Sequence, residues 1–233
     1  MGNAIRWLKL QVAKIDVGQS DDDAKEQLCA AIDQFVLQRV VISNKSVIQQ
    51  GARRVEDGDS VLVFGGHALL QDTFLSAWRE GKKFAVIIVD DAFDPTGVAM
   101  SKRLRQAGIP VTYCPDVRLA CIQARRTTKT LVAAETLFED GSVYARVGTA
   151  DIARATVAAR SSLLVLCQSL NITDRIPTDS LTYNEIDPDR ASNAGLRLLY
   201  DVIKPAEIDI ILLEDSGVTP HLIPERLKKL DFL

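Results

Sequence analysis

The sequence predicts an α/β protein in which a helical N-terminal portion precedes a doubly wound, Rossmann-like domain with a mainly parallel sheet. First, apolar residues recur at helical spacing from Asn3 to about Glu56. Second, short apolar runs alternate with helical stretches after Ser60, and these runs are apolar on both faces. Strands of this kind form parallel sheets that helices cover on both sides. Third, 233 residues with 47% apolar content suffice for one large core.

Residues 1–57 are predicted to form the helical N-terminal portion. The acidic run Asp21–Glu26 lies where a helix N-terminus favours negative charge, and the polar turn Glu56–Asp59 ends the helical pattern. The apolar stripe comprises Leu28, Ile32, Phe35, Val36, Val40, Val47 and Ile48.

Residues 58–233 are predicted to form the α/β domain, without an internal repeat or flexible linker. The expected strands are Val61–Phe64, Ala85–Asp90, Pro110–Cys114, Thr130–Ala134, Leu163–Cys167 and Asp209–Leu213. The expected helices are His67–Glu80, Gly97–Ala107, Val117–Arg126, Gly148–Arg160 and Ala191–Val202.

Composition excludes several classes of function. The 28 basic and 31 acidic residues give a net charge of −3, and no basic block suggests nucleic-acid binding. No apolar run reaches the roughly 18 residues of a membrane span, and no signal peptide is recognisable. The four cysteines form no CxxC pair, which favours reduced, mostly packed thiols in a cytosolic protein over a disulfide or zinc framework. We expect no metal.

Ligands of doubly wound domains bind at the carboxyl ends of the strands. The turn Phe64–His67 lacks the spacing of a dinucleotide fingerprint or a P-loop, so we interpret it as a tight strand-to-helix turn with His67 facing solvent. The pair Asp90–Asp91 is better explained as a helix cap or turn than as a ribose or metal contact. Cys114 and Cys167 have no histidine nearby in sequence and are expected to be packed.

The stretch Leu131–Asp151 carries the most information about a site. It contains a buried strand ending at Glu135, a turn at Glu139–Gly141, and the sequence Arg146–Thr149 at a helix start. The helix N-terminus could donate N–H groups to a sugar phosphate while the carboxylate moves a proton. A capped turn without a ligand explains the same residues equally well.

These residues resemble a superfamily that joins methylthioribose-1-phosphate and ribose-1,5-bisphosphate isomerases with the regulatory subunits of eukaryotic translation initiation factor 2B. The enzymes carry Gly-Ala-Asp, then Asn-Lys-Ile-Gly-Thr, where this chain has Ala133–Glu135 and Ala145–Thr149. They also place a catalytic cysteine after the first strand, at the position of Gly65. Aldose–ketose interconversion requires positioned acid and base groups, and glycine supplies neither. The resemblance therefore implies no catalytic residue, no cofactor and a degenerate sugar-phosphate pocket, comprising Gly65, Gly66, Glu135, Arg146 and Thr149.

Within this superfamily, the chain is most similar to the delta subunits. The matching segments, in delta-like order, are GNAIRWLK, AIDQFV, DGDSVLVFG, AWREGKKF, GSVYARVGTA, NEIDPD and LRLLYDV. The resemblance implies a regulatory, non-catalytic subunit of the guanine-nucleotide exchange factor for initiation factor 2. Such a subunit pairs with the beta subunit, joins the other subunits and senses the phosphorylated alpha subunit of initiation factor 2. Because delta subunits usually carry an N-terminal extension, we expect a fragment or a shortened relative.

The resemblance also implies a subunit interface, comprising Leu181, Asn184, Glu185, Leu196, Leu198 and Leu199. The predicted helix Ala191–Val202 is apolar on more than one side, which favours burial against a neighbouring chain, although an ordinary core helix is the alternative. Leu181, Leu196 and Leu198 match positions that line a small-molecule pocket across the symmetry axis in relatives. The N-terminal helices are where the family meets initiation factor 2. A divergent isomerase and a sugar-phosphate-binding homodimer remain as alternatives.

Overall fold

The computed structural model describes residues 2–16, 18–181, 183–186 and 198–229. The helices are α1 (Gly2–Ala13), α2 (Asp21–Phe35), α3 (Ser43–Arg54), α4 (Ala68–Arg79), α5 (Gly97–Gln106), α6 (Ala120–Ala124), α7 (Thr149–Ala158) and α8 (Ile223–Leu227). The strands of the large sheet are β1 (Ser60–Phe64), β2 (Ala85–Val89), β3 (Val111–Cys114), β4 (Lys129–Ala133), β7 (Ser162–Leu166), β10 (Ile210–Leu212) and β11 (Gly217–Val218). Across the described ranges, no helix is long and apolar enough to cross a bilayer.

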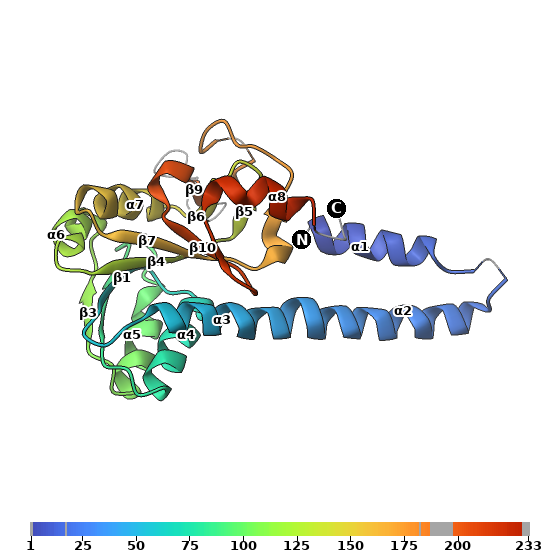
Figure 1. Cartoon of the computed structure of the whole chain (residues 1–233), viewed down its shortest axis with the longest axis horizontal. Coiled ribbons are helices and arrows are strands. Elements are labelled where there is room, and N and C mark those ends of the chain that lie inside the picture. Colours follow the sequence, from blue (N-terminus) through green and yellow to red (C-terminus); the bar gives the residue numbers. More distant parts are fainter. Residues whose placement is uncertain (1, 17, 182, 187–197, 230–233) are drawn as a thin grey trace.

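The first two helices form a hairpin that extends away from the α/β body (Figure 1). The acidic helix start is confirmed at α2, where the side chain of Ser20 accepts a hydrogen bond from the amide of Asp23. The rings of Trp7 and Phe35 stack with their centroids 4.2 Å apart, which joins α1 to α2. α1 and α2, both within the segment predicted to be helical, therefore lie as an antiparallel pair (Figure 1).

A π-helix, η1 (Val36–Ile42), lies between α2 and α3, so residues 21–54 run as one continuous rod. The sequence pattern did not predict this change of hydrogen-bonding pattern. The carbonyl of Val40, within the π-helix, accepts a hydrogen bond of 3.2 Å from the side-chain amide of Gln168. π-helical turns often occur near functional positions, and this one is bonded to the segment that follows β7.

The large sheet has the order β11-β10-β7-β4-β1-β2-β3, and its pairs are parallel except for β10 with β11. From β1 the chain builds outward through β2 and β3, then returns to the other side of β1 with β4, β7 and β10. This is the doubly wound order predicted from the sequence. The order reverses between β1 and β4, and the carboxyl ends of these two strands are where a ligand site is expected.

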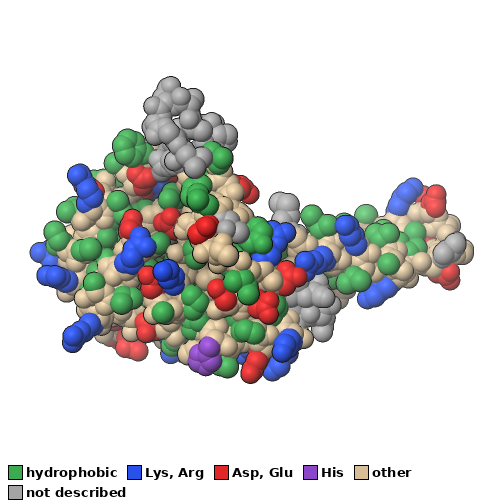
Figure 2. All heavy atoms as spheres, turned by 90° about the horizontal axis from the view of Figure 1, so that it is seen from above, with side chains coloured by type: hydrophobic (Ala, Val, Ile, Leu, Met, Phe, Trp, Pro, Cys, Tyr) green, Lys and Arg blue, Asp and Glu red, His purple; other side chains and the backbone are tan. Residues whose placement is uncertain are grey.

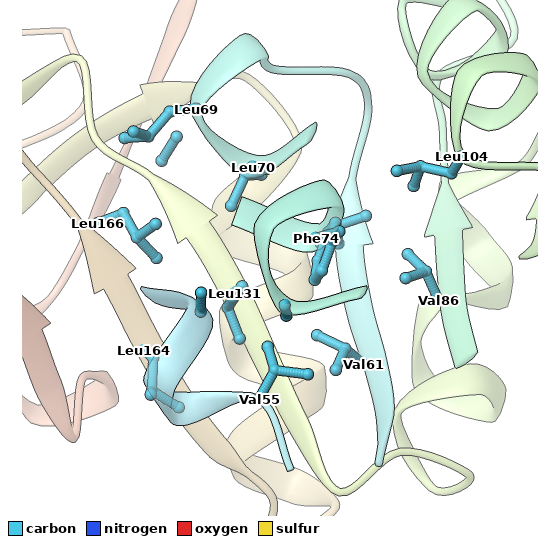
Figure 3. Close-up of a cluster of buried hydrophobic side chains, with 14 of the residues drawn as sticks. Val55, Val61, Leu69, Leu70, Phe74, Val86, Leu104, Leu131, Leu164 and Leu166 are labelled. Carbon is cyan, nitrogen blue, oxygen red and sulfur yellow. The ribbon is translucent and has the colours of Figure 1, made fainter. Parts of the chain in front are cut away.

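Helices cover both faces of this sheet because alternate strand residues point to opposite sides. On one face, Phe74 and neighbouring residues of α4 pack with Val55 against Val61, Leu131 and other strand residues (Figure 3). On the other face, Leu62 and residues of α6 and α7 form a separate buried cluster. The face under α4 includes Val55 and two buried residues of α3, so the last helix of the N-terminal portion is part of the core.

A second sheet was not predicted. It has the order β8-β5-β6-β9 and comprises β5 (Thr136–Phe138), β6 (Val143–Arg146), β8 (Ile172–Thr173) and β9 (Tyr200–Ile203). Its strands are too short to show a clear periodicity in the sequence. The predicted helix Ala191–Val202 is wrong over its last residues, because Tyr200–Ile203 pairs with β6 as a strand. The rest of that prediction, residues 191–197, lies outside the described residues.

Candidate functional site

The turn after β1 lies at the point where the strand order reverses. Gly65 adopts a φ of +61°, and its amide donates a hydrogen bond of 2.8 Å to the carbonyl of Val89. The amide of Gly66 donates to the hydroxyl of Thr96 at 3.0 Å, and a Cβ at Gly66 would collide with the backbone of Thr96. Both positions require glycine. The interpretation of this segment as a tight strand-to-helix turn is confirmed.

His67 does not simply face solvent, and that prediction was wrong. The ring caps α4, because Nδ1 accepts a hydrogen bond of 3.1 Å from the amide of Leu69. Nε2 therefore carries the proton and lies 3.6 Å from Oε1 of Glu135. The hydrogen bond from His67 lowers the pKa of the Glu135 carboxyl below its usual value, although partial burial opposes this shift. The cap therefore holds the ring beside Glu135, which follows β4.

Arg146 lies at the end of β6 with its guanidinium held by the loop that follows β2. One nitrogen contacts the carboxylate of Asp94 at 3.0 Å and the carbonyl of the same residue. The other donates to the hydroxyl of Thr96 and lies 3.5 Å from Asp90. The guanidinium also sits over the ring of Phe64, 5.4 Å from its centroid. The cation therefore already has its partners within the chain.

Asp90 is fully buried at the end of β2. Its carboxylate accepts hydrogen bonds from the amides of Gly97, at 2.7 Å, and Asp91, at 3.0 Å, and from the hydroxyl of Tyr113 at 3.0 Å. The predicted cap role is confirmed by the bond to Gly97, the first residue of α5. Burial and then the carboxylate of Asp90 raise the pKa of Tyr113 to about 12. Asp90 thus fixes the loop that holds Arg146.

The N-terminus of α7 is occupied by a carboxylate that sequence reasoning missed. Asp201, on β9, accepts hydrogen bonds from the amides of Gly148 and Ala150. The hydroxyl of Thr149 donates to the carbonyl of Arg146 at 2.6 Å. Burial raises the pKa of Asp201 above its usual value, although the two amides oppose this. A phosphate at this helix start would have to displace Asp201, and no local pattern links residues that far apart in sequence.

Four of the five predicted pocket residues line one cavity of about 90 Å³ at the switch point: Gly66, Glu135, Arg146 and Thr149. Gly65 adjoins it, since a Cβ there would meet the guanidinium of Arg146. A neighbouring cavity of about 230 Å³ shares Glu135 and extends to Asn3 and Arg6 of α1. Within the described ranges, no group of three or more His, Cys, Asp or Glu side chains could hold a metal ion.

The cysteines divide into two pairs. Cys114 and Cys167 are buried as predicted, whereas Cys29 and Cys121 are exposed, which corrects the expectation of mostly packed thiols. Burial raises the pKa of both buried thiols, and the charges of Glu214 and Glu135 raise that of Cys167 further. Cys167 therefore stays protonated and does not replace the thiol that the enzymes place at Gly65.

The predicted interface residues lie around the second sheet. The side chain of Asn184 donates to the carbonyl of Tyr200 at 2.6 Å and accepts from its amide at 3.2 Å, so it ties the preceding loop to β9. Leu181 is 63% exposed, and Glu185 is also exposed. Leu198 pairs with Ile186 in an isolated bridge, and Leu199 bonds to Glu185 through its amide. Leu196 lies outside the described residues.

Comparison with known proteins gives a family match over nearly the whole chain. The model of the initiation factor 2 subunit family matches residues 1–218. The chain belongs to this family. The translation initiation factor eIF2B subunit delta of Schizosaccharomyces pombe is 33% identical over 243 residues, covering 94% of this chain and 52% of the relative. This member of the family thus spans about half the length of that curated relative.

Two further comparisons bear on structure and chemistry. A crystal structure of the tetrameric eIF2B beta2-delta2 complex from C. thermophilum matches with a TM-score of 0.88 and 37% identity, covering 92% of this chain and 69% of that chain. The ribose 1,5-bisphosphate isomerase of Pyrococcus furiosus is 27% identical over 191 residues, covering 77% of this chain and 59% of the relative. The family member described here is thus similar to both branches that the sequence motifs indicated.

Proposed function

We propose that this chain is a non-catalytic, delta-type regulatory subunit of the guanine-nucleotide exchange factor for initiation factor 2. The similarity to delta subunits supports this role. The switch-point site supports the absence of isomerase chemistry, because Gly65 supplies no acid or base and the guanidinium of Arg146 fills the space beside it. Cytosolic location follows from this role in translation.

The observation that carries the assembly role is a set of exposed apolar side chains on the segment before the undescribed residues 187–197. We call this set the loop patch; its members are Ile176, Leu181, Tyr183 and Ile186. Tyr183 has a φ of +62°, and the guanidinium of Arg175 stacks 4.9 Å from its ring centroid. A bulky residue is rarely held in this backbone region without a functional reason. Several exposed apolar side chains along one short segment favour a protein interface.

The loop patch is proposed to meet a beta-type subunit, with the predicted interface residues Leu181, Asn184, Glu185, Leu196, Leu198 and Leu199 contributing. Asn184 anchors the loop that carries these residues, because its side chain is hydrogen-bonded to the backbone of Tyr200. The leucines are proposed to supply apolar contact area, since the buried core of an interface is more apolar than the rest of a protein's surface.

The test is the solution mass of the chain mixed with the beta-type subunit of the same organism, measured by light scattering. We expect a heterodimer or its doubled form for the wild type, and loss of pairing for Leu181→Glu. Ile122→Glu is the matched control, because Ile122 on α6 is similarly exposed and lies outside the loop patch. Pairing by Leu181→Glu at wild-type affinity would refute the surface. A stable homodimer that ignores the beta-type subunit would refute the role.

The helical hairpin is proposed to take part in binding the alpha subunit of initiation factor 2. The exposed apolar side chains of the hairpin and of the π-helix η1 that continues α2 are Ile5, Leu8, Leu10, Val12, Ile32, Val36, Leu37, Val40, Val41 and Ile42. Figure 2 shows apolar side chains among the charges along the hairpin. A helix pair that extends from the body with this much apolar surface has the character of a binding element.

Binding is tested on the assembled complex with phosphorylated and unphosphorylated alpha subunit. We expect Leu37→Glu, on the π-helix, to weaken binding of the phosphorylated form at least tenfold and to leave assembly with the beta-type subunit intact. Val157→Glu on α7 is the control, because Val157 is similarly exposed but lies away from the hairpin. Unchanged binding of the phosphorylated alpha subunit by Leu37→Glu would refute a contribution of the exposed apolar residues of the π-helix.

A further inference from the structure

Three groups at the switch point that could bind an external anion each lie against a carboxylate of the chain itself. These groups are a guanidinium, an imidazole and a helix N-terminus. The pairs are Arg146 with Asp90 and Asp94, His67 with Glu135, and the amides of Gly148 and Ala150 with Asp201. Three donors typical of a phosphate pocket are therefore already engaged within the chain.

The pair between Arg146 and Asp94 is the one that solvent can reach. The side chain of Asp94 is 44% exposed, whereas Asp90 is fully buried and bonded to Gly97 and Tyr113. The side chain of Arg146 is 23% exposed, and Arg146 lines the cavity. Of the carboxylates on this cation, only that of Asp94 lies where an anion from solution could replace it.

The dimensions restrict the ligand. The cavity of about 90 Å³ is roughly three times the ~30 Å³ that one water molecule occupies in the liquid. A phosphate or similar tetrahedral oxyanion fits such a volume. A larger ligand would have to extend toward the adjoining cavity at Glu135.

We propose that the loop Asp90–Gly97 is an internal clamp that keeps a latent phosphate site closed. In this clamp the carboxylate of Asp94 pairs with the guanidinium of Arg146, the cation that would otherwise bind the phosphate. Thr96 completes the clamp, because its hydroxyl accepts from Arg146 and also bonds the amide of Gly66 in the turn after β1. Loss of the Asp94 carboxylate would leave the guanidinium beside Thr96 and Asp90, but it would remove the solvent-exposed anion that now pairs with it, so a phosphate in the cavity could take that place. The clamp is independent of the subunit role proposed above.

The test uses inorganic phosphate as the probe and the full chain as the protein, with binding measured by calorimetry and by the midpoint of thermal unfolding. We expect Asp94→Asn to bind phosphate at least tenfold more tightly than the wild type. At a tenfold excess of phosphate over its dissociation constant, the melting temperature of this variant should rise by about 3 °C. Circular dichroism confirms that the variant is folded, and Asp94→Ser provides a second form of the same change.

Two controls make the outcome decisive. Asp116→Asn releases Arg118 from a comparable pair on the surface, where the freed arginine lines none of the cavities at the switch point, and should gain no phosphate binding. Adding Arg146→Met to Asp94→Asn should abolish the gain. Equal phosphate affinity in the wild type and Asp94→Asn, a gain that survives Arg146→Met, or the same gain in Asp116→Asn would each overturn the clamp.

Discussion

Replacing Gly65 with alanine would place a methyl group where the guanidinium of Arg146 and the hydroxyl of Thr96 now lie. Both contacts are side-chain ends that could swing away. Arg146 can do so only by giving up its bonds to Thr96 and Asp94, because those bonds set its position. The substitution therefore measures how firmly the chain holds its own cation in the degenerate pocket.

The loss of folding stability expected for Gly65→Ala has two contributions. An L-residue in the left-handed region costs about 1–2 kcal/mol relative to glycine, and Gly65 has a φ of +61°. Displacing the partly exposed guanidinium adds about 1–2 kcal/mol, the net value of charge-assisted hydrogen bonds discounted for solvent screening. Gly81 separates the two contributions: its φ is +89°, and a Cβ there would meet nothing within 4 Å. Gly81→Ala should lose about 1–2 kcal/mol and Gly65→Ala about 2–4 kcal/mol.

The assay is urea unfolding of both variants, with thermal unfolding as a second measurement. For a chain of this length, 1 kcal/mol shifts the melting temperature by about 2–4 °C, so the additional loss of about 1–2 kcal/mol should make Gly65→Ala melt about 2–8 °C below Gly81→Ala. Equal losses in the two variants would show that Arg146 moves aside freely. The loop Asp90–Gly97 would then not hold the guanidinium in place. The positive φ of Gly65 would be the remaining reason for glycine at this position.

Two further predictions concern the carboxylates of Asp59, which is buried, and Asp201, which is half-buried. Asp59 accepts hydrogen bonds from Lys129 at 2.7 Å and Thr128 at 2.6 Å, which lower its pKa although burial opposes them. The resulting stability is present above the unfolded pKa of about 3.9 and is lost as the pH falls through the folded value. Asp59→Ala should therefore lose about 3 kcal/mol at pH 7 and flatten the acid side of the stability profile in urea titrations. Asp201 has a raised pKa, so its contribution declines as the pH rises above about 4. Asp201→Asn should accordingly gain stability relative to the wild type between pH 4 and 7, and a constant difference across that range would contradict the assigned burial.

The large sheet could be predicted because its strands are buried on both faces. Val61–Phe64 and Leu163–Leu166 are continuous apolar runs, and such runs identify strands without any knowledge of their neighbours. The second sheet could not be predicted in this way. Residues 200–203 form a strand because Val143–Arg146 offers an edge with which to pair, and that edge is more than fifty residues away.

The sequence by itself determined the chemistry of the candidate site. The segments Ala133–Glu135 and Ala145–Thr149 indicated the family, and the glycine at the position of the enzymes' cysteine argued against isomerase chemistry. Four of the five predicted pocket residues line one cavity. These features are local, since they depend on residue type and on short spacings along the chain.

Tertiary structure decided what the site is bonded to. Asp94 pairs with the guanidinium of Arg146, and Asp201 accepts a hydrogen bond from the amide of Gly148 at the start of α7. The ring of His67 lies beside Glu135 instead of simply facing solvent. These contacts join loops and strands that the sheet brings together at the carboxyl ends of β1, β2 and β4. The energy of an ion pair depends on the distance between two groups and on their burial, and neither quantity is set by a local sequence pattern.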